Sequence, residues 1–447
     1  MKYKKSIIIL VLAIFLFSVA GVCASDANDN VGELSQADAD EMVSVEETEL
    51  ISLTENEEIT IERNVGTFSE LQNNITEKYG STLILTKDYE HGDDFESNGI
   101  IINQSITIDG QGHKIDAQGK SRIFKITVDN VILKNINFIN GNTIMEGGAV
   151  HFEKSGTVSD CNFTNNIASE DGGTVWMTSG SMTDCNFINN SASRGGAVCF
   201  YEKGNLTNCN FNNNSAETGG AVFIENDYSN SKIISTFINN CAKNGGAVYF
   251  NGAVNNVIIN SVFRNNGAER TGGAIFVRGQ SMNSNFSSEF YGNQAIKASG
   301  GAIFFNSLTE NNSFESIFTN NYALYGGAVF FYKKANYNKF NSNFTSNVAK
   351  SCGGAMFFYN TTDNNNFTCN YINNLALGQV DETVGNGGAI TFKNTSTNSI
   401  FTCDFINNTA NLNGGGVNYR QTPYNITFNG NFINNTSPRG GGVNFFE

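Results

Sequence analysis

Apolar and polar residues alternate along most of the chain with a period of two, which is the pattern of β-strands. Two short motifs carry this alternation, and they occur in turn, twelve times each. In the first, two glycines precede a strand whose large apolar residues, such as Val248 and Phe250, fall on one face. In the second, a small residue separates two large ones, as in Phe286, Ser288 and Phe290. A narrow interior needs this alternation of size, so we expect these side chains to fill the core.

The regular spacing of the motifs predicts a solenoid. Successive glycine pairs lie 23 to 28 residues apart, except for one step of 34 in which residues 378–386 are expected to form a loop insertion. Helical repeats are longer, and a leucine-rich pattern is absent from the sequence. We therefore predict an all-β fold, a right-handed single-stranded parallel β-helix with a short N-terminal cap helix. The repeat is best defined by Gly147, Gly148, Gly195, Gly196, Gly245, Gly246, Gly326, Gly327, Phe138, Phe187, Phe237, Phe318, Phe344 and Phe405.

Glycine and asparagine are expected to form the corners between strands. Glycine adopts left-handed backbone conformations without steric cost, and asparagine tolerates them better than other residues. Asparagine pairs follow the motif aromatic, for example Asn189 with Asn190 and Asn239 with Asn240. Stacked asparagines can also hydrogen-bond amide to amide along the axis of the solenoid.

The start of the solenoid is expected to be covered by a helix. Residues 67–70 have the spacing of a capping box, and Phe68, Leu71 and Ile75 would share one helical face. The sequence therefore predicts a helix over residues 67–79, which would protect an open sheet edge.

The N-terminal residues carry no solenoid pattern. Basic residues precede an apolar run over residues 7–22, which is the layout of a secretory signal cleaved after Ala24, with an uncleaved anchor as the alternative. The next stretch has thirteen carboxylates, the single base Arg63 and no aromatic residue, so it cannot bury enough apolar area to fold. We expect a signal peptide (1–24), a disordered acidic linker (25–66), an N-terminal cap with the first coils (67–138) and the repeat β-helix (139–447).

The net charge of −15 is concentrated in the acidic linker. Residues 67–447 carry only −6, so the predicted solenoid is mildly acidic. A phosphate backbone requires a basic surface, and nucleic acid is therefore not an expected partner.

The repeated GGAV or GGAI and FxxN motifs resemble those of the chlamydial polymorphic outer-membrane proteins. The whole layout resembles the adhesin-like proteins of methanogenic archaea, and residues 106–117 resemble the first coils of pectin-lyase-like β-helices. The resemblance implies a secreted or cell-surface protein that displays a binding surface without catalysis. Implied partners are a host or neighbouring cell surface, glycans, or other copies of the chain, with no membrane span in the mature protein. The exposed faces would present Asn, Thr and Ser together with Tyr201, Tyr325 and Tyr332.

Two other functions remain open at this point. Polysaccharide lyases and hydrolases also use parallel β-helices, and they need clustered carboxylates or a base. Asp109, His113 and Asp116 form the densest such cluster and would be the catalytic residues of an enzyme, although no catalysis, cofactor or metal is expected; His91 and His151 are interpreted as surface residues. The third candidate is a structural envelope protein that self-associates through its final coil.

Cysteine usage favours buried thiols. Five of the eight cysteines beyond Cys23 lie two residues before the motif aromatic, in a slot that holds serine in other repeats. This exchange suggests that the slot selects small size and that the thiols are free, with disulfides between neighbouring coils as the alternative. The spacing does not match a zinc site. These cysteines are Cys161, Cys185, Cys209, Cys369 and Cys403.

Overall fold

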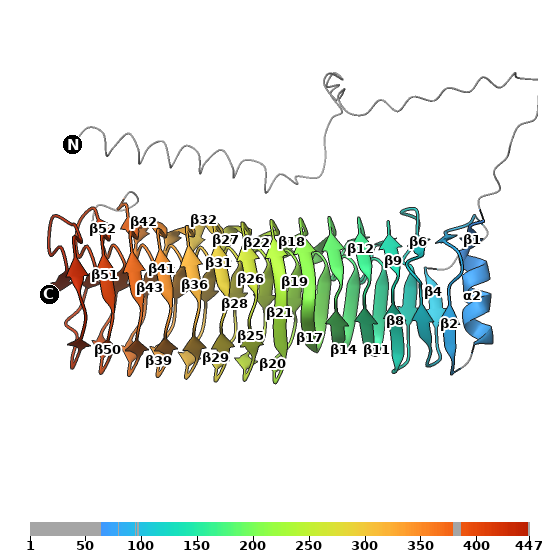
Figure 1. Cartoon of the computed structure of the whole chain (residues 1–447), viewed down its shortest axis with the longest axis horizontal. Coiled ribbons are helices and arrows are strands. Elements are labelled where there is room, and N and C mark those ends of the chain that lie inside the picture. Colours follow the sequence, from blue (N-terminus) through green and yellow to red (C-terminus); the bar gives the residue numbers. More distant parts are fainter. Residues whose placement is uncertain (1–63, 79, 94, 96–97, 379–385, 446–447) are drawn as a thin grey trace, which may run out of the picture.

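The chain winds into a right-handed parallel β-solenoid of about 14 turns, which confirms the predicted fold class. The structure, a computed structural model, describes residues 64–78, 80–93, 95, 98–378 and 386–445. The turns stack into a rod with a helix at the N-terminal end (Figure 1). The predicted signal peptide, nearly all of the acidic linker and most of the predicted loop insertion lie outside the described residues. None of the described helices is long and apolar enough to cross a membrane.

The predicted cap helix is present as α2 (Phe68–Glu77). The Thr67 side chain accepts a hydrogen bond from the Glu70 backbone N–H, as expected for a helix N-cap. The buried residues of α2 are Phe68, Leu71 and Ile75, the face that the sequence predicted.

Strands at the same position in successive turns pair in parallel and in register, and they form sheets of 38, 11 and 7 strands. The strands that follow the glycine pairs belong to the largest sheet. They are β11 (Val150–Ser159), β14 (Val175–Thr183), β17 (Val198–Asn212), β19 (Val222–Ile224), β23 (Val248–Phe250), β28 (Ile275–Val277), β33 (Ile303–Phe305), β38 (Val329–Phe331), β43 (Met356–Phe358), β48 (Ile390–Phe392), β53 (Val417–Tyr419) and β56 (Val443–Phe445).

The other strands of the largest sheet form the first coils and the second motif. They are β1 (Gly66–Thr67), β2 (Thr82–Ile84), β3 (Tyr89–Glu90), β4 (Ile100–Ile102), β5 (Thr107–Asp109), β6 (Lys114–Asp116), β7 (Phe124–Ile126), β8 (Val131–Lys134), β9 (Asn137–Ile139), β12 (Asn162–Thr164), β15 (Asn186–Ile188), β21 (Lys232–Ile238), β25 (Ile258–Ile259), β26 (Val262–Arg264), β30 (Asn285–Phe286), β31 (Glu289–Tyr291), β35 (Ser313–Phe314), β36 (Ile317–Thr319), β40 (Lys339–Phe340), β41 (Asn343–Thr345), β45 (Asn366–Phe367), β46 (Asn370–Ile372), β50 (Ile400–Phe401), β51 (Asp404–Ile406), β54 (Thr427–Phe428) and β55 (Phe432–Ile433).

The eleven-stranded sheet lies just before the glycine pairs, and we call it the arm sheet. It contains β10 (Asn142–Thr143), β13 (Ile167–Ala168), β16 (Ser191–Arg194), β18 (Ser215–Thr218), β22 (Cys241–Asn244), β27 (Gly267–Thr271), β32 (Gln294–Ser299), β37 (Tyr322–Tyr325), β42 (Val348–Cys352), β47 (Leu375–Ala376) and β52 (Thr409–Ala410). The seven-stranded sheet contains β20 (Tyr228–Ser229), β24 (Val254–Asn255), β29 (Ser281–Met282), β34 (Thr309–Glu310), β39 (Ala335–Asn336), β44 (Thr362–Asp363) and β49 (Ser396–Thr397).

The motif aromatics form one continuous stack through the core. Neighbouring rings from Phe138 to Phe432 lie 4.6 to 5.0 Å apart with interplanar angles of 1 to 9°. This spacing follows from the strand separation of a parallel sheet, about 4.8 Å, which places like side chains above like. Each ring therefore packs on its equivalents in the turns above and below.

The two glycines of each pair have different roles. Gly245 has a φ of 62°, so it supplies the left-handed corner. A Cβ on Gly246 would instead lie 2.1 Å from the carbonyl oxygen of Gly273, the equivalent glycine in the next turn. The second glycine is thus required by the close approach of adjacent turns, and not by the backbone freedom that we attributed to both.

The two asparagines after the motif aromatic also differ. Asn239 takes the left-handed corner with a φ of 54°, whereas Asn240 is fully buried. The Asn240 Nδ2 group donates to the side-chain oxygen of Asn266 at 3.0 Å and to the Phe211 carbonyl at 3.0 Å. The same bonds recur along the core from Asn166 to Asn435, which gives the amide ladder that the sequence suggested.

From β25 and β26 onward the second motif forms two short strands, whereas β21 runs through it as one strand. The chain bends between β30 and β31 at the small residue Ser288. The Ser288 hydroxyl accepts a hydrogen bond from the Ser261 backbone N–H at 3.0 Å and donates to the Ile259 carbonyl at 2.9 Å. Size alone therefore does not explain why serine occupies this slot. Its hydroxyl also accepts a hydrogen bond from the Ser261 backbone N–H, which the bend leaves outside the ladder.

Candidate binding surfaces

The three residues that would serve an enzyme each bind structural partners. Asp109 forms a salt bridge with Lys134 at 2.9 Å and accepts a hydrogen bond from the Gln111 backbone N–H at 3.1 Å. Asp116 accepts from the Gln118 backbone N–H at 2.8 Å. Gln111 and Gln118 both have left-handed backbones, so the two carboxylates stabilise equivalent tight turns.

The third member of that cluster, His113, faces a different carboxylate. Its Nδ1 atom lies 3.1 Å from the Asp88 carboxylate. Burial opposes ionisation of Asp88, but hydrogen bonds from the Lys114 backbone and the His113 ring outweigh it and lower the Asp88 pKa. The side chains of Asp109, His113 and Asp116 therefore bind other residues of the first coils and not one another.

The Asp109 carboxylate should make the fold sensitive to acid. Burial raises the pKa of Asp109, but hydrogen bonds from Lys134, Asn135 and Gln111 outweigh it and bring the pKa to about 2. Because the folded pKa lies below the unfolded value, this contribution is complete above about pH 4 and is lost as the pH falls towards 2. We expect the Asp109→Asn variant to have a lower melting temperature than the wild type at pH 7. Below pH 3 the two melting temperatures should become nearly equal. A difference between the two proteins that does not change with pH would contradict this assignment.

The interpretation as surface residues is wrong for His91, which is buried, whereas His151 is half-buried. His91 is buried against the rings of Phe68 and Phe95, with centroids 5.2 and 5.5 Å away. His151 is the second residue of β11 and pairs in register with Trp176 of the next turn. The two rings therefore stack, with centroids 4.6 Å apart. Burial and the positive charge of Arg122 lower the pKa of His151 to about 4.

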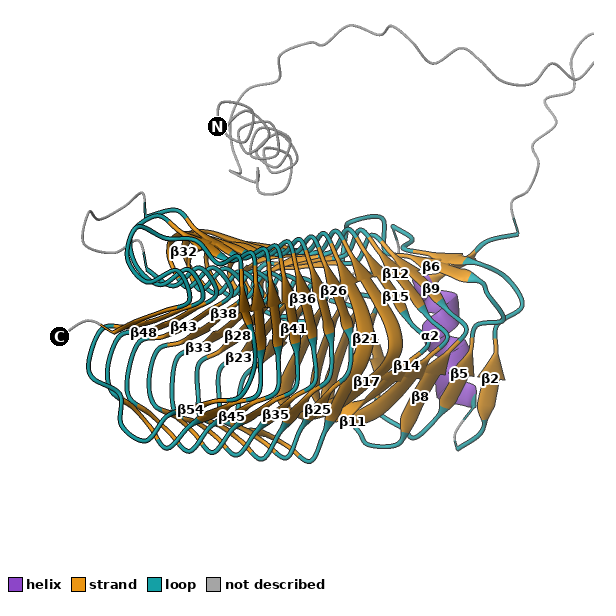
Figure 2. Ribbon diagram, turned by 60° about the vertical axis from the view of Figure 1, so that its left-hand side comes forward, coloured by secondary structure: helices purple, strands orange, loops and turns teal. Residues whose placement is uncertain are grey.

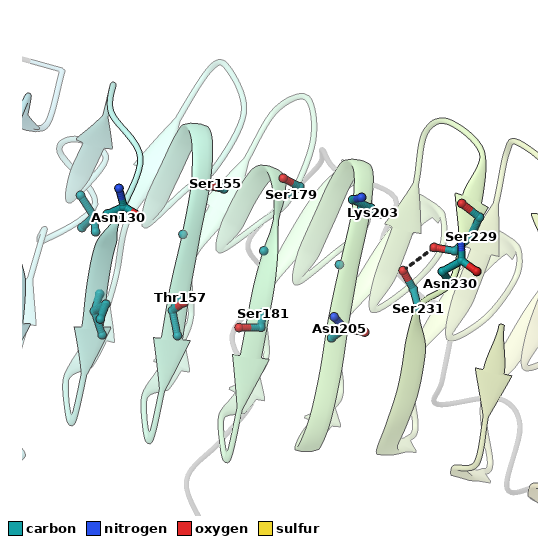
Figure 3. A pocket seen from close by; sticks show the side chains of 15 residues that line it. Asn130, Ser155, Thr157, Ser179, Ser181, Lys203, Asn205, Ser229, Asn230 and Ser231 are labelled. Atoms are coloured by element: carbon teal, nitrogen blue, oxygen red, sulfur yellow. Dashed lines mark hydrogen bonds between the residues drawn. The ribbon is translucent and has the colours of Figure 1, made fainter. Parts of the chain in front are cut away.

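A polar groove lies on the side of the N-terminal turns, and we call it the hydroxyl face. It encloses about 560 Å³ and is lined by backbone and by small polar side chains (Figure 3). Gly156, Gly180 and Gly204 stack in register along its floor. A Cβ on Gly180 would lie 2.2 Å from the Gly156 carbonyl oxygen, so the close approach of these two turns excludes a side chain at this position. The labelled side chains along it are Asn130, Ser155, Thr157, Ser179, Ser181, Lys203, Asn205, Ser229, Asn230 and Ser231.

A second aromatic stack lies outside the main core. It is formed by the middle residues of six strands that follow a glycine pair, from β19 to β43. Neighbouring rings from Phe223 to Phe330 stack at 4.7 to 5.4 Å. Phe357 continues it with an edge-to-face contact to Phe330 at 5.2 Å. We call it the outer stack; its members are Phe223, Tyr249, Phe276, Phe304, Phe330 and Phe357, and all are buried.

The arm sheet explains why the outer stack is buried. Tyr325 of β37 packs on Phe357 of β43, with ring centroids 5.8 Å apart. Figure 2 shows the row of strands that contains β32 running beside the row that contains β33 and β38. The left-handed glycine corner folds these two rows towards each other.

A groove of about 510 Å³ opens at the C-terminal end of the outer stack, and we call it the aromatic groove. Tyr332 and Tyr359 lie on its wall with centroids 5.2 Å apart, and Tyr332 is 37% exposed. The Lys393 ammonium sits 3.7 Å from the centroid of the Tyr359 ring, and Arg420 comes from the following turn. The groove thus combines aromatic faces with two cations.

The structure separates the three tyrosines that we expected on the exposed faces. Tyr325 and Tyr332 both line the aromatic groove, whereas Tyr201 is exposed beside Trp176 in the N-terminal half. Neither Lys393 and Arg420 nor the outer stack was predicted from the sequence as part of a binding surface. The signal was present, because the residue between the two inward positions is aromatic in six successive repeats.

No disulfide bond joins the cysteines that the structure describes, and all of them except Cys241 are buried. Burial raises the pKa of Cys199 well above its ordinary value, so this thiol stays protonated. Cys369 and Cys403 continue the hydrogen-bonding role of the serine slot, since the Cys369 backbone N–H donates to the Cys403 sulfur at 3.3 Å. Among the described residues, no group of three or more His, Cys, Asp or Glu is placed to hold a metal ion.

Comparison with known families identifies one repeat. The profile of the Chlamydia polymorphic membrane protein repeat matches residues 260–278, which run from just before β26 through the glycine pair Gly272 and Gly273 to the residue after β28. A search of curated proteins found no match. The chain is therefore a parallel β-solenoid that contains a repeat similar to those of the polymorphic membrane proteins, as expected for an adhesin-like repeat protein.

Proposed function

We propose that the protein is exported and displayed at the cell surface, where its lateral faces bind a partner without turnover. The partner would be a host or neighbouring cell, its glycans, or other copies of the chain. This is the role of the adhesin-like proteins of methanogenic archaea that the sequence resembles. Neither a cofactor nor a nucleic acid is required for this role.

The observation that carries the proposal is the in-register repetition of outward side chains along the rod. Each outward position of a strand becomes a row, and a row of weak contacts adds up along an extended ligand or a cell surface. The hydroxyl face and the aromatic groove are two such rows, and both are open along the side of the rod.

A glycan array combined with a polysaccharide-degradation assay tests this function. We expect the protein to retain array ligands and to release no shortened product from any of them. Asp109→Ala is the matched variant, because Asp109 belongs to the cluster that would serve an enzyme and lies in β5, in the first coils of the rod. Product release that disappears in this variant would replace the adhesin-like function with a lyase or hydrolase.

A further inference from the structure

We propose that the aromatic groove is a binding site for an acidic oligosaccharide, in which tyrosine rings stack on sugar rings and Lys393 with Arg420 binds a sugar carboxylate. The inference rests on the proposed function, because it names the ligand class of one surface of the same rod. It follows from the order of four side chains, from the spacing of the turns and from the distribution of charge.

The four side chains occupy one position in four successive turns. Each directly follows the third and last residue of its strand, which faces inward. These last residues pair in register as Phe331 with Phe358, Phe358 with Phe392, and Phe392 with Tyr419. The row along the rod therefore reads Tyr332, Tyr359, Lys393 and Arg420. Two aromatic faces are followed directly by two cations.

The spacing of this row suits a sugar chain. Successive turns are about 4.8 Å apart, which is close to the length of one pyranose residue in an extended β-linked chain. The exposed side of Tyr332 offers an apolar face beside polar groups, the combination that binds the C–H face of a sugar, and the Tyr359 ring next to it holds the Lys393 ammonium in place. One sugar per turn would then place the next residues of the chain beside Lys393 and Arg420.

The charge around the groove favours an anion. Residues 321–447 carry seven Lys and Arg against five Asp and Glu, whereas residues 67–320 carry sixteen against twenty-four. Within the described part of the chain, no carboxylate forms a salt bridge with Lys393 or Arg420 and none lines the groove. Both positive charges are therefore available to an anionic ligand in the groove.

A carboxylate is an anion that these two residues can bind together. Arginine presents a planar fork that matches a carboxylate in two hydrogen bonds, and the lysine adds a point charge. Nucleic acid fits less well, because a long polyanion would also meet the acidic remainder of the rod. The occupant is therefore a short stretch of carboxylated sugars within a glycan.

Titration calorimetry with β-1,4-linked oligoglucuronate tests the site, with the glucose oligomer of the same length as the uncharged probe. We expect the charged oligomer to bind at least about tenfold more tightly than the neutral one, and binding to weaken as ionic strength rises. Lys393→Gln and Arg420→Gln should each reduce affinity for the charged oligomer about tenfold without changing affinity for the neutral one. Tyr332→Ala should weaken the binding of both oligomers. A sulfated glucose oligomer that bound as tightly as the oligoglucuronate would overturn the assignment to carboxylates.

Matched controls separate the groove from the rest of the surface. Lys339→Gln and Tyr424→Ala remove an exposed lysine and an exposed tyrosine of the same half of the rod, and neither residue lines the groove. Both variants should bind as the wild type does. A second measurement needs no variant: bound oligoglucuronate should protect Lys393, and not Lys339, from acetylation detected by mass spectrometry.

Two outcomes distinguish this site from the proposed function. Unchanged binding in Lys393→Gln and Arg420→Gln, or equal labelling of Lys393 with and without ligand, would overturn the groove while the array result stands. Product release in the degradation assay would instead overturn the function, and the groove would then be a subsite of an enzyme.

Discussion

Gly246→Ala should be among the most destabilising single substitutions in the rod, because the added methyl group meets backbone and not a movable side chain. Its Cβ would lie 2.1 Å from the Gly273 carbonyl oxygen and 2.6 Å from that of Gly267, both in the next turn. The two turns can separate only by breaking in-register hydrogen bonds such as that from the Gly246 N–H to the Gly272 carbonyl. We expect a loss of about 4 kcal/mol or more in the free energy of unfolding, at the upper end for point substitutions.

Denaturant unfolding and limited proteolysis together measure this effect. Because solenoids unfold by neighbouring repeats, proteolytic cleavage should begin near residue 246 while the ends of the rod stay protected. Gly119→Ala is the matched control, since Gly119 has a φ of 72° with nothing within 4 Å of its Cβ. That variant carries only the strain of a left-handed alanine, roughly 1 to 2 kcal/mol. Equal losses in the two variants would show that backbone conformation, and not close approach, determines the requirement for glycine.

The inward positions of the solenoid could be predicted from sequence because alternation assigns the two faces of a strand. Val248 and Phe250 were expected to be buried, and both are. Tyr249 falls between them and so lies on the opposite face of the strand, yet it is only 8% exposed. Alternation specifies which side of a strand a residue takes, but not whether another sheet covers that side. Whether the arm sheet covers this face depends on the direction that the chain takes at each glycine corner, and alternation along a strand does not specify that direction.

The candidate site was only half visible in the sequence for a related reason. Tyr325 and Tyr332 were expected on an exposed face, but Lys393 and Arg420 lie sixty residues and more beyond them in the chain. They join Tyr332 only because the turns stay in register across a 34-residue step between glycine pairs. Asp109, His113 and Asp116 show the opposite case, because their closeness in sequence reflects two tight turns and an ion pair. In a solenoid, residues one period apart meet more reliably than residues that are close in sequence.

The buried asparagine ladder should be nearly as intolerant of substitution as the second glycine. The Asn266 side-chain oxygen accepts from both the backbone N–H and the Nδ2 group of Asn240 at 3.0 Å, and its own Nδ2 group donates to the Phe237 carbonyl at 2.9 Å. Asn266→Leu would remove all three hydrogen bonds and would leave the buried Asn240 backbone N–H without its partner, and an unsatisfied buried group costs about 1 to 3 kcal/mol. We therefore expect a loss of about 3 to 5 kcal/mol, measured by denaturant unfolding.

The neighbouring residue provides the control for this second prediction. Asn265 has a left-handed φ of 53° and is exposed, so Asn265→Gly keeps the corner and removes no buried hydrogen bond. That variant should change the free energy of unfolding by less than about 1 kcal/mol. Asn266→Asp tests the mechanism further, because it keeps the size of the side chain but replaces the Nδ2 donor with an acceptor and brings a charge into the core. If the aspartate variant were as stable as the wild type, hydrogen bonding along the ladder would not be what holds the turns in register.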